Sequence, residues 1–441
     1  MSAGTDGPWA GRRLHFVGIG GAGMSGWARV ALQLGAAVSG TDRADSPVLA
    51  RLAAAGAQVH VGHDAAHVPA GAEVVFSTAV PADNPERAVA RAHGRPERPR
   101  AELLRELTGL KRTIAVAGAH GKTTTTSMVA HILLTLGMGP GYLIGGTLST
   151  SEENADWGTG DWLVVEADES DRSMLALDVE VAVVTNVELD HHATYGSLGE
   201  VQDVFRAFLA APPHAVLLDR PEVVALRGGR PHVGFDLPPA PLELLLPGDH
   251  NQRNAQAAVE AAVLAGAPRD AAAAALASFR GARRRFEELG RTPAGTRVVD
   301  DYAHHPTEVA ATLRAAREVA GSGRVVAVFQ PHLFSRTEHL AVEFGAALAL
   351  ADLPALLDVY PARERAEDFP GVSGLTLAEA VADAAPGREV LWLRDFAAAE
   401  RVLRARLRPD DLLLVMGAGD VDVLGRRLLA DPGAVAAPAG G

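Results

Sequence analysis

The chain has 441 residues, of which 48% are hydrophobic and 22% charged, a composition typical of a globular protein with two or three domains. Its net charge of −13 and its lack of a basic run argue against a nucleic-acid or membrane-surface partner. The absence of cysteine excludes disulfides, thiolate metal sites and thiol nucleophiles. Because no signal pattern and no apolar stretch of roughly 18 residues occurs, we expect a cytoplasmic enzyme, either a monomer or a homodimer.

Short apolar segments alternate with alanine-rich helical stretches, a pattern typical of parallel α/β layers. Three successive groups of strands, each opening with a glycine turn, predict three nucleotide-binding-like domains in tandem. We place them at residues 1–110, 111–285 and 286–441. The expected strands lie at 14–17, 37–39, 58–61 and 74–77; at 113–117, 162–166, 181–185 and 215–218; and at 297–300, 324–329, 356–359, 390–393 and 412–416. A long helix is expected to begin near 250, with an asparagine at or near its cap.

The motif GAHGKTTT follows an apolar strand and opens a helix. In that position backbone amides and the helix dipole bind phosphate. Lys122 is expected to reach the β- and γ-phosphates of a nucleotide, and the Thr123 hydroxyl to ligate Mg²⁺. The spacing differs from the strict P-loop, because Gly118 precedes Gly121 by three positions and not five. The alternative is a turn in which glycine only permits close packing.

Two polar motifs follow later strands of the same group. EADESD places four carboxylates at a strand end, where parallel sheets bind ligands, so this motif can hold the metal that bridges nucleotide oxygens. By itself it could equally be a solvated acidic turn. The next strand is followed by NVELDHH, whose Asp190, His191 and His192 can ligate a metal or orient a substrate.

The first group opens with GIGGAG, and Asp42 follows nineteen residues after Gly23. In isolation this is the dinucleotide fingerprint and suggests NAD. Physically, the motif requires only a ligand whose diphosphate binds at a helix N-terminus, and a nucleotide sugar meets this requirement equally well. A glycine-rich packing turn is the third reading.

The third group carries DDYAHHPTEV directly after a strand and FQPHLFSRT at the end of the next strand. Both motifs contain histidine, and the second contributes His332 and Arg336, whose guanidinium is suited to a carboxylate. We expect these two strand ends to form a wall that faces the substrate. The later turn GAGD, residues 417–420, is a weaker signal.

These motifs together resemble the Mur ligase family, in order, from about residue 13 to residue 420. The matching segments are GIGGAGMSG, GAHGKTTTT, EADESD, TNVELDHH, GDHNQRNA, RRRF, DDYAHHPTEV and FQPHLFSRT. The resemblance implies a Rossmann-like N-terminal domain for a UDP-sugar, a central P-loop-type ATPase domain, and a Rossmann-like C-terminal domain for the incoming amino acid. The branch that is most similar uses ATP and Mg²⁺ to join L-alanine to UDP-N-acetylmuramate through an acyl phosphate, in peptidoglycan precursor synthesis.

The resemblance also assigns residues. The ATP site would comprise Gly118, Ala119, His120, Gly121, Lys122, Thr123, Thr124, His250, Asn251, Asn254, Arg284 or Arg285, and Asp300. Magnesium would be ligated by Thr123, Glu166 and His191. The UDP-sugar would contact Gly18, Gly20, Gly21, Ala22, Gly23, Met24, Ser25 and Asp42. L-Alanine would face Tyr302, His304 and Arg336. The expected catalytic residues are Lys122, His191, His304 and Arg336, and His191 or His304 would take the proton of the amine.

Three positions depart from the family pattern: Leu333 stands where arginine is usual, Ala193 where an acid is usual, and Ala303 where glycine is usual. Three alternatives remain open. A sister ligase of the family joins a tripeptide to the same sugar. An NAD-dependent dehydrogenase would use Gly18–Gly23 but leaves the other motifs unexplained. A non-catalytic nucleotide-binding regulator would require damaged phosphate and metal residues.

Overall fold

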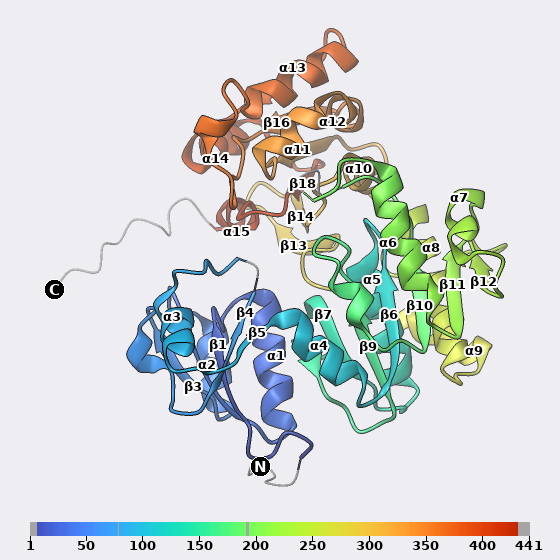
Figure 1. The fold of residues 1–441 in the computed structure, drawn as a ribbon. Helices are drawn as coiled ribbons and strands as arrows, with labels where there is room; N and C mark the ends of the chain where they lie inside the picture. Colours follow the sequence, from blue (N-terminus) through green and yellow to red (C-terminus); the bar gives the residue numbers. More distant parts are fainter. Residues whose placement is uncertain (1–6, 78, 191–193, 431–441) are drawn as a thin grey trace. The chain divides into compact units, whose positions relative to one another are not determined.

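The structure, a computed structural model, describes residues 7–77, 79–190 and 194–430, apart from the side chain of Ala22. The chain divides into two compact units, coloured along the sequence in Figure 1. The first unit comprises Met1–Glu188, Leu198–Glu243 and Asn254–Phe279, and the second comprises Leu189–Ser197, Leu244–Arg253 and Arg280–Gly441. None of the helices in the described part of the chain has the length and apolar character needed to cross a lipid bilayer.

The first unit begins with a sheet of five parallel strands in the order β3-β2-β1-β4-β5. The strands are β1 (Arg13–Val17), β2 (Ala37–Asp42), β3 (Gln58–Val61), β4 (Glu73–Phe76) and β5 (Glu97–Pro99). The helices are α1 (Ala22–Gln33), α2 (Pro47–Ala54), α3 (Pro85–Ala92) and α4 (Arg100–Thr108), with a 3₁₀ turn at Ala65–His67. Four of the five residues of β1 are buried, as its apolar run and central place require.

The second sheet of this unit has seven strands in the order β12-β11-β10-β6-β9-β7-β8. Within the described residues only the β7–β8 pair is antiparallel. The strands are β6 (Arg112–Ala117), β7 (Gly141–Leu148), β8 (Glu153–Asp156), β9 (Trp162–Glu166), β10 (Val181–Val184), β11 (His214–Leu218) and β12 (Val233–Phe235). The helices are α5 (Lys122–Thr135), α6 (Leu198–Ala210), α7 (Pro221–Val224), α8 (Asp249–Leu264) and α9 (Arg269–Ala275), and 3₁₀ turns lie at Ser173–Ala176, Ala225–Arg227 and Leu276–Ser278.

The second unit contains a sheet of six strands in the order β13-β14-β18-β15-β16-β17, with β13 antiparallel to β14 and the other pairs parallel. The strands are β13 (Glu287–Arg291), β14 (Arg297–Asp301), β15 (Val325–Phe329), β16 (Leu353–Leu356), β17 (Leu391–Trp392) and β18 (Leu412–Met416). The helices are α10 (Pro306–Ala320), α11 (Phe334–His339), α12 (Ala341–Leu348), α13 (Gly374–Ala384), α14 (Phe396–Arg406) and α15 (Asp422–Leu429), with a 3₁₀ turn at Ala366–Asp368.

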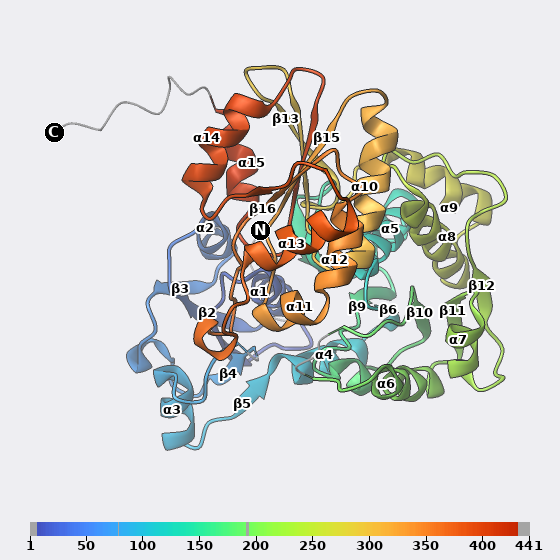
Figure 2. The same cartoon turned by 90° about the horizontal axis from the view of Figure 1, so that it is seen from above.

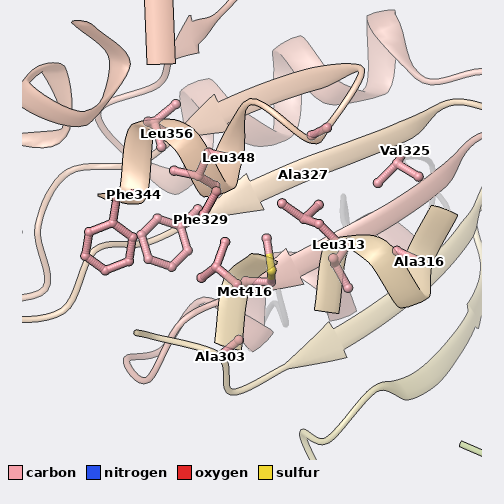
Figure 3. Packing of buried hydrophobic residues seen from close by; sticks show 14 of the residues in the cluster. Ala303, Leu313, Ala316, Val325, Ala327, Phe329, Phe344, Leu348, Leu356 and Met416 are labelled. Atoms are coloured by element: carbon pink, nitrogen blue, oxygen red, sulfur yellow. The ribbon is translucent and has the colours of Figure 1, made fainter. Parts of the chain in front are cut away.

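Both faces of this sheet are covered, which explains why β15, β16 and β18 are apolar along their whole length. Along β15, Val325, Ala327 and Phe329 pack against α10, α12 and α13 (Figure 3). The alternate residues Val326 and Val328 pack against α14 and α15 on the other face, and the two groups of helices are seen on either side of the sheet in Figure 2. This alternation follows from the two-residue period of a strand.

The predicted α/β fold, with sheets that open on glycine turns, is confirmed. The predicted strands at 58–61, 162–166 and 412–416 match β3, β9 and β18, and most others differ by one to three residues at an end. The structure adds strands that the sequence reading did not include: β5, β7, β8, β12 and β13. The domain limits at residues 110 and 285 stay predictions.

One local prediction was wrong and another is confirmed. The strand expected at 356–359 is β16, which ends at Leu356 and contains Pro354, a residue that strand rules disfavour because it lacks an N–H. The helix expected near 250 is α8, which begins at Asp249 and has Asn251 in its first turn, where the Asn251 side chain donates to the carbonyl of Pro247 at 2.8 Å.

Candidate active site

The loop between β6 and α5 is shaped by two glycines with positive φ, 141° at Gly118 and 82° at Gly121. A Cβ on Gly118 would lie 2.1 Å from Thr185 Oγ1, and one on Gly121 would lie 2.7 Å from Asn254 Oδ1. Glycine is therefore required at both positions. The loop leads into the N-terminus of α5, where Gly121 supplies no side-chain cap, so the first amides of the helix are suited to an anion.

Lys122 folds back over this loop. Its Nζ donates to the carbonyls of Gly118 and Ala119 and to both carboxylate oxygens of Glu169, at 3.1 and 3.0 Å. Burial lowers the pKa of Lys122, but the charges of Glu169 and Asp168 raise it more, so that its pKa lies above the ordinary 10.5. Lys122 is therefore a fixed cation beside the loop. Glu169 was part of the acidic motif, but the sequence did not indicate this pairing.

The back of the loop is held by the residues that follow β10. Asn186 accepts from the backbone N–H of His120 at 3.1 Å and donates to the His120 carbonyl at 2.7 Å. Thr185 Oγ1 donates to the same carbonyl at 2.6 Å, and the His120 ring lies 2.9 Å from a carboxylate oxygen of Glu188. His120 is thus a part of the loop's scaffold, and Asn186 is a support residue that the sequence did not single out.

Oxygen ligands for a cation lie next to this loop. β9 pairs with β6, so that Glu166 at the end of β9 lies beside Val116, just before the loop. The Glu166 carboxylate accepts from the backbone N–H of Gly145 at 2.7 Å, and Thr123 lies in the first turn of α5. Hydroxyl and carboxylate oxygens suit Mg²⁺. No group of three acidic or histidine residues able to hold a metal occurs among the described residues, and His191 lies outside them.

The turn after β1 has the form of an anion-binding turn at the start of α1. Gly18 has a φ of 74°, and Gly21 is the N-cap of α1 without a side-chain hydrogen bond. The backbone N–H of Gly20 donates to Asp42 Oδ2 at 2.9 Å, and a Cβ on Gly20 would meet the same oxygen. Asp42 therefore stabilises the turn itself. Ala22 is the first residue of α1.

The first turns of α1 are closely packed. A Cβ on Gly23 would lie 2.9 Å from a terminal nitrogen of Arg100, which places a cation beside this turn. Met24 is buried, and the buried Ser25 hydroxyl accepts from the side chain of Asn154 at 3.3 Å. Arg100 begins α4 and was not among the predicted ligands, since it belongs to an arginine-rich segment without a motif of its own.

Asp300 and Arg284 form the centre of a polar group in the second unit. Arg284 Nε donates to Asp300 at 3.2 Å, and its terminal nitrogens donate to the carbonyls of Gly417 and Gly419 at 2.7 and 2.9 Å. Of the two arginines proposed for this role, Arg284 contacts Asp300, whereas Arg285 faces Glu308 at 3.8 Å. The structure thus pairs Arg284 with Asp300, and the role of either arginine at the nucleotide stays a prediction.

Two adjacent carboxyl groups in this group have raised pKa values. Burial raises the pKa of Asp300 to about 7, although Arg284 lowers it in part. Burial likewise raises the pKa of Asp301 to about 6, while Asp301 accepts from the backbone N–H groups of Phe286 and Ala303, each at 2.7 Å. Asp301 thereby fixes the turn that leads to His304.

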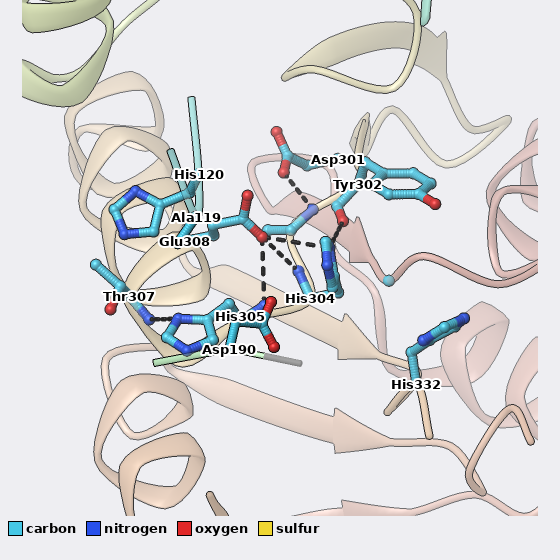
Figure 4. Close-up of polar contacts among 12 residues, drawn as sticks. Ala119, His120, Asp190, Asp301, Tyr302, His304, His305, Thr307, Glu308 and His332 are labelled. Carbon is cyan, nitrogen blue, oxygen red and sulfur yellow. Dashed lines mark hydrogen bonds and ion pairs between the residues drawn. The ribbon is translucent and has the colours of Figure 1, made fainter. Parts of the chain in front are cut away.

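His304 lies between Tyr302 and Glu308 (Figure 4). Its Nδ1 lies 3.0 Å from the Tyr302 carbonyl, and its backbone N–H donates to Glu308 at 3.1 Å. The neighbouring His305 caps α10 in a capping box with Glu308. Burial lowers the pKa of His304 to about 4, so the imidazole is neutral at pH 7, with the proton on Nδ1 and the lone pair on Nε2.

His332 lies next to His304 in the second unit. Its ring lies 6.2 Å from that of His304 and stacks on Tyr360 at 5.6 Å. Burial lowers the pKa of His332 to about 3, and electrostatic repulsion by a second proton on His304 and by the Arg336 and Arg363 charges contributes to the lowering. His332 is therefore neutral at pH 7 as well. The structure thus brings the DDYAHH and FQPHLFSRT motifs together, as predicted.

Arg336 forms a buried ion pair within the second unit. Its guanidinium donates to both oxygens of Asp190, at 2.9 and 3.2 Å, and both side chains are 5% exposed. Leu333 has a φ of 72° and is buried, and its backbone N–H donates to the Tyr360 carbonyl at 3.0 Å. The Arg336 guanidinium is occupied by a protein carboxylate, so its contact with L-alanine stays a prediction.

The residues at the start of α8 divide between the two units. His250 and Asn251 belong to the second unit, and the buried Asn254 belongs to the first unit beside Gly121. Their common role at adenine stays a prediction. His192 and Ala193, like His191, lie outside the described residues.

Comparison with known protein families gives three matches along the chain. Residues 13–112 match the model of the Mur ligase family catalytic domain, residues 116–228 the Mur ligase middle domain, and residues 284–419 the glutamate ligase domain of Mur ligases. Across most of its length the chain is also 46% identical to a protein of Acidothermus cellulolyticus, with 93% of each chain covered. The chain belongs to the Mur ligase family.

The Acidothermus relative is named UDP-N-acetylmuramate–L-alanine ligase. A relative of the same name from Kineococcus radiotolerans is 47% identical, with 95% of each chain covered. Among solved structures, UDP-N-acetylmuramate–alanine ligase of Thermotoga maritima is similar with a TM-score of 0.79 and 29% identity, over 94% of this chain and 98% of that one. The segment that matches the middle domain contains the β6–α5 loop. The segment that matches the glutamate ligase domain contains DDYAHHPTEV and FQPHLFSRT.

Proposed function

We propose that this Mur ligase is an ATP-dependent enzyme that joins L-alanine to the carboxylate of UDP-N-acetylmuramate. The observation that carries the proposal is the loop Gly118–Gly121, whose glycines leave no room for a Cβ, with Lys122 held beside it as a cation. The names of relatives that are 43–47% identical over most of their length support the choice of substrates. We place the reaction in peptidoglycan precursor synthesis.

The phosphates of ATP would bind at the N-terminus of α5. The amides of the loop donate to phosphate oxygens, and Lys122 exchanges its contacts with the Gly118 and Ala119 carbonyls for the β- and γ-phosphates. Glu169 keeps the ammonium oriented toward the loop during this exchange. Arg100 and the turn Gly18–Gly21 would hold the diphosphate of the UDP-sugar.

Magnesium would be held by the Thr123 hydroxyl and the Glu166 carboxylate, with His191 as a further ligand. When bound, Mg²⁺ neutralises charge on the transferred phosphoryl group. The fit rests on the oxygen donors that β9 and α5 bring to the loop. Gly145 orients Glu166 by donating to one of its carboxylate oxygens at 2.7 Å.

The chemistry proceeds in two displacements. A carboxylate oxygen of the muramyl group attacks the γ-phosphorus of ATP, the bond to the β,γ-bridging oxygen breaks, and ADP leaves with the electron pair. The amine of L-alanine then attacks the acyl carbon, and inorganic phosphate leaves as the amide forms. Lys122 and the loop amides stabilise the charge that develops in the first displacement.

His304 is suited to take the amine's proton in the second displacement. Its Nδ1 proton is directed to the Tyr302 carbonyl, so that Nε2 carries the lone pair. Because its pKa is about 4, the ring is neutral at pH 7 and its Nε2 carries no proton before the reaction. Glu308 fixes the main chain at His304 by accepting from its backbone N–H.

The test is phosphate release from ATP with UDP-N-acetylmuramate present and L-alanine, glycine, L-serine or the tripeptide L-alanyl-γ-D-glutamyl-meso-diaminopimelate added separately. Release that depends on L-alanine is the expected result. Release with the tripeptide alone would assign the chain to the sister branch. No release with any acceptor, from protein that binds ATP, would contradict a ligase.

A further inference from the structure

Four loops meet at the carboxyl edge of the sheet in the second unit, because β14, β18, β15 and β16 are consecutive neighbours in it. Parallel α/β sheets bind ligands at this edge. The loops carry Tyr302 and His304 after β14, Gly417–Asp420 after β18, His332 after β15 and Tyr360 after β16. A ligand with a carboxylate that binds here needs a cation from one of these loops.

The arginines already described at this edge are engaged by the protein. Arg284 donates to Asp300 and to the carbonyls of Gly417 and Gly419. Arg336 donates to the buried Asp190 through Nε and Nη2, and its Nη1 faces His332 Nδ1 at 3.4 Å. Neither side chain can swing away to a ligand without leaving a buried carboxylate unpaired, which is strongly unfavourable.

The turn that follows β16 is fixed against the loop that follows β15. Tyr360 N–H donates to the Pro331 carbonyl at 2.8 Å, and the Leu333 N–H donates back to the Tyr360 carbonyl at 3.0 Å. Four residues further on, Glu364 accepts from the Ser335 backbone N–H at 3.0 Å and from its hydroxyl. The segment 360–364 is therefore held at both ends, which determines where the residues between them lie.

Arg363 lies within this fixed segment and is exposed. Across residues 7–77, 79–190 and 194–430, its guanidinium makes no hydrogen bond or ion pair with the protein. Its charge is near enough to contribute to the lowered pKa of His332. The His332 Nδ1 accepts from Arg336 at 3.4 Å, so the proton of this neutral ring is on Nε2, which is a second donor at the same place.

We propose that Arg363 binds the carboxylate of the incoming amino acid, with the Nε2–H of His332 as its neighbouring donor. Arg363 is then a specificity-determining residue, because it selects a free α-carboxylate. Leu333 cannot supply this charge, and the Arg336 side chain is held by Asp190. The assignment rests on the proposed ligase function and adds the residue that recognises the acceptor.

The experiment compares wild-type protein with Arg363→Ala and with Arg365→Ala. Arg365 is a matched control, because it is an exposed arginine two positions further along the chain, where it pairs with Asp368. Three quantities are measured: the KM for L-alanine, the rate with L-alaninamide relative to L-alanine, and ADP formation in a single turnover with UDP-N-acetylmuramate but no amino acid. L-Alaninamide keeps the amine and methyl group but lacks the carboxylate charge.

In Arg363→Ala we expect the KM for L-alanine to rise about 10- to 100-fold, the range of a charge-assisted hydrogen bond. The preference for L-alanine over L-alaninamide should shrink by a similar factor, while single-turnover ADP formation stays as in wild type. An unchanged KM and preference, or equal changes in Arg365→Ala, would overturn the assignment. If wild-type protein itself shows no release that depends on L-alanine, the proposed function fails instead.

Discussion

Arg336 on α11 and Asp190 in the segment 189–197 form a bidentate, buried ion pair, with Nη2–Oδ distances of 2.9 and 3.2 Å. They are 146 positions apart in the sequence. Asp190 directly precedes His191 in the sequence, and Arg336 lies four residues after His332. The pair therefore connects the segment 189–197, which carries a predicted metal ligand, to the loops of the same unit that are expected to bind the amino acid.

Breaking this pair should destabilise the second unit. Arg336→Met or Asp190→Ala alone leaves a buried charge uncompensated, and each should cost about 3–5 kcal/mol. The double variant should lose less than the sum of the two, since it removes both charges. Urea unfolding of the three variants measures the coupling, and additive losses would show that the pair is not coupled.

Gly118→Ala should abolish nucleotide turnover. An alanine there meets Thr185 Oγ1 at 2.1 Å in addition to its positive φ, so the loop must move. Gly137→Ala is the control, because Gly137 has a φ of 70° with nothing within 4 Å of an added Cβ. Both variants should lose roughly 1 kcal/mol to backbone strain. ATP binding followed by calorimetry should be lost in Gly118→Ala alone, and equal binding in both would contradict the role of the contact.

Lys122→Ala should reduce turnover by at least about 10²- to 10³-fold, because it removes the cation nearest to the transferred phosphate. Binding of UDP-N-acetylmuramate should persist, since the Gly18–Gly21 turn lies on a different sheet. Lys111, the chain's only other lysine, donates to the Trp157 carbonyl and is the control for substitution. Normal turnover in Lys122→Ala would refute the assignment of the phosphate loop.

Glu166→Gln should raise the Mg²⁺ concentration for half-maximal activity by about 10- to 100-fold, because an amide oxygen replaces a charged ligand. Asp171→Asn is the control from the same motif, since Asp171 is exposed and accepts from the Ser173 N–H. Activity titrated with MgCl₂ in excess ATP measures the shift. Equal shifts in both variants would argue for a general effect of charge and against Glu166 as a ligand.

The glycine turns and apolar strands were predictable because each is a local pattern: a glycine loop between a strand and a helix, or a run such as TIAVA that suits a buried strand. β16 was misplaced because Pro354 obscures a strand that its buried position between β15 and β17 stabilises. The β7–β8 hairpin was missed since its strands carry three glycines and several polar side chains.

The sequence allowed the residue types at the site to be predicted, but it did not allow the pairs that these residues form to be predicted. The sequence grouped Lys122, Glu169 and Asp190 into motifs, but tertiary packing decides which carboxylate each cation meets. Arg336 was expected on a substrate because its partner Asp190 is 146 positions away. Arg363 carries no motif at all, and only the hydrogen bonds that fix the segment 360–364 reveal its place.

Asp300 gives the stability of the protein a characteristic dependence on pH. Its pKa is about 7 in the folded protein and 3.8 when unperturbed. Between these values the folded state holds a proton that the unfolded state has released, so stability falls as pH rises from 4 to 7 and the loss is complete above pH 7.

Asp300→Asn removes this ionisation while keeping an acceptor for Arg284. The unfolding free energy of this variant, measured by urea denaturation at several pH values, should therefore fall less steeply with pH than that of wild type. The two slopes should differ by about 1.4 kcal/mol per pH unit at most. Asp301, whose pKa is about 6, leaves a smaller slope of the same sign in this variant. A slope identical to wild type would mean that Asp300 is ionised throughout, held so by Arg284.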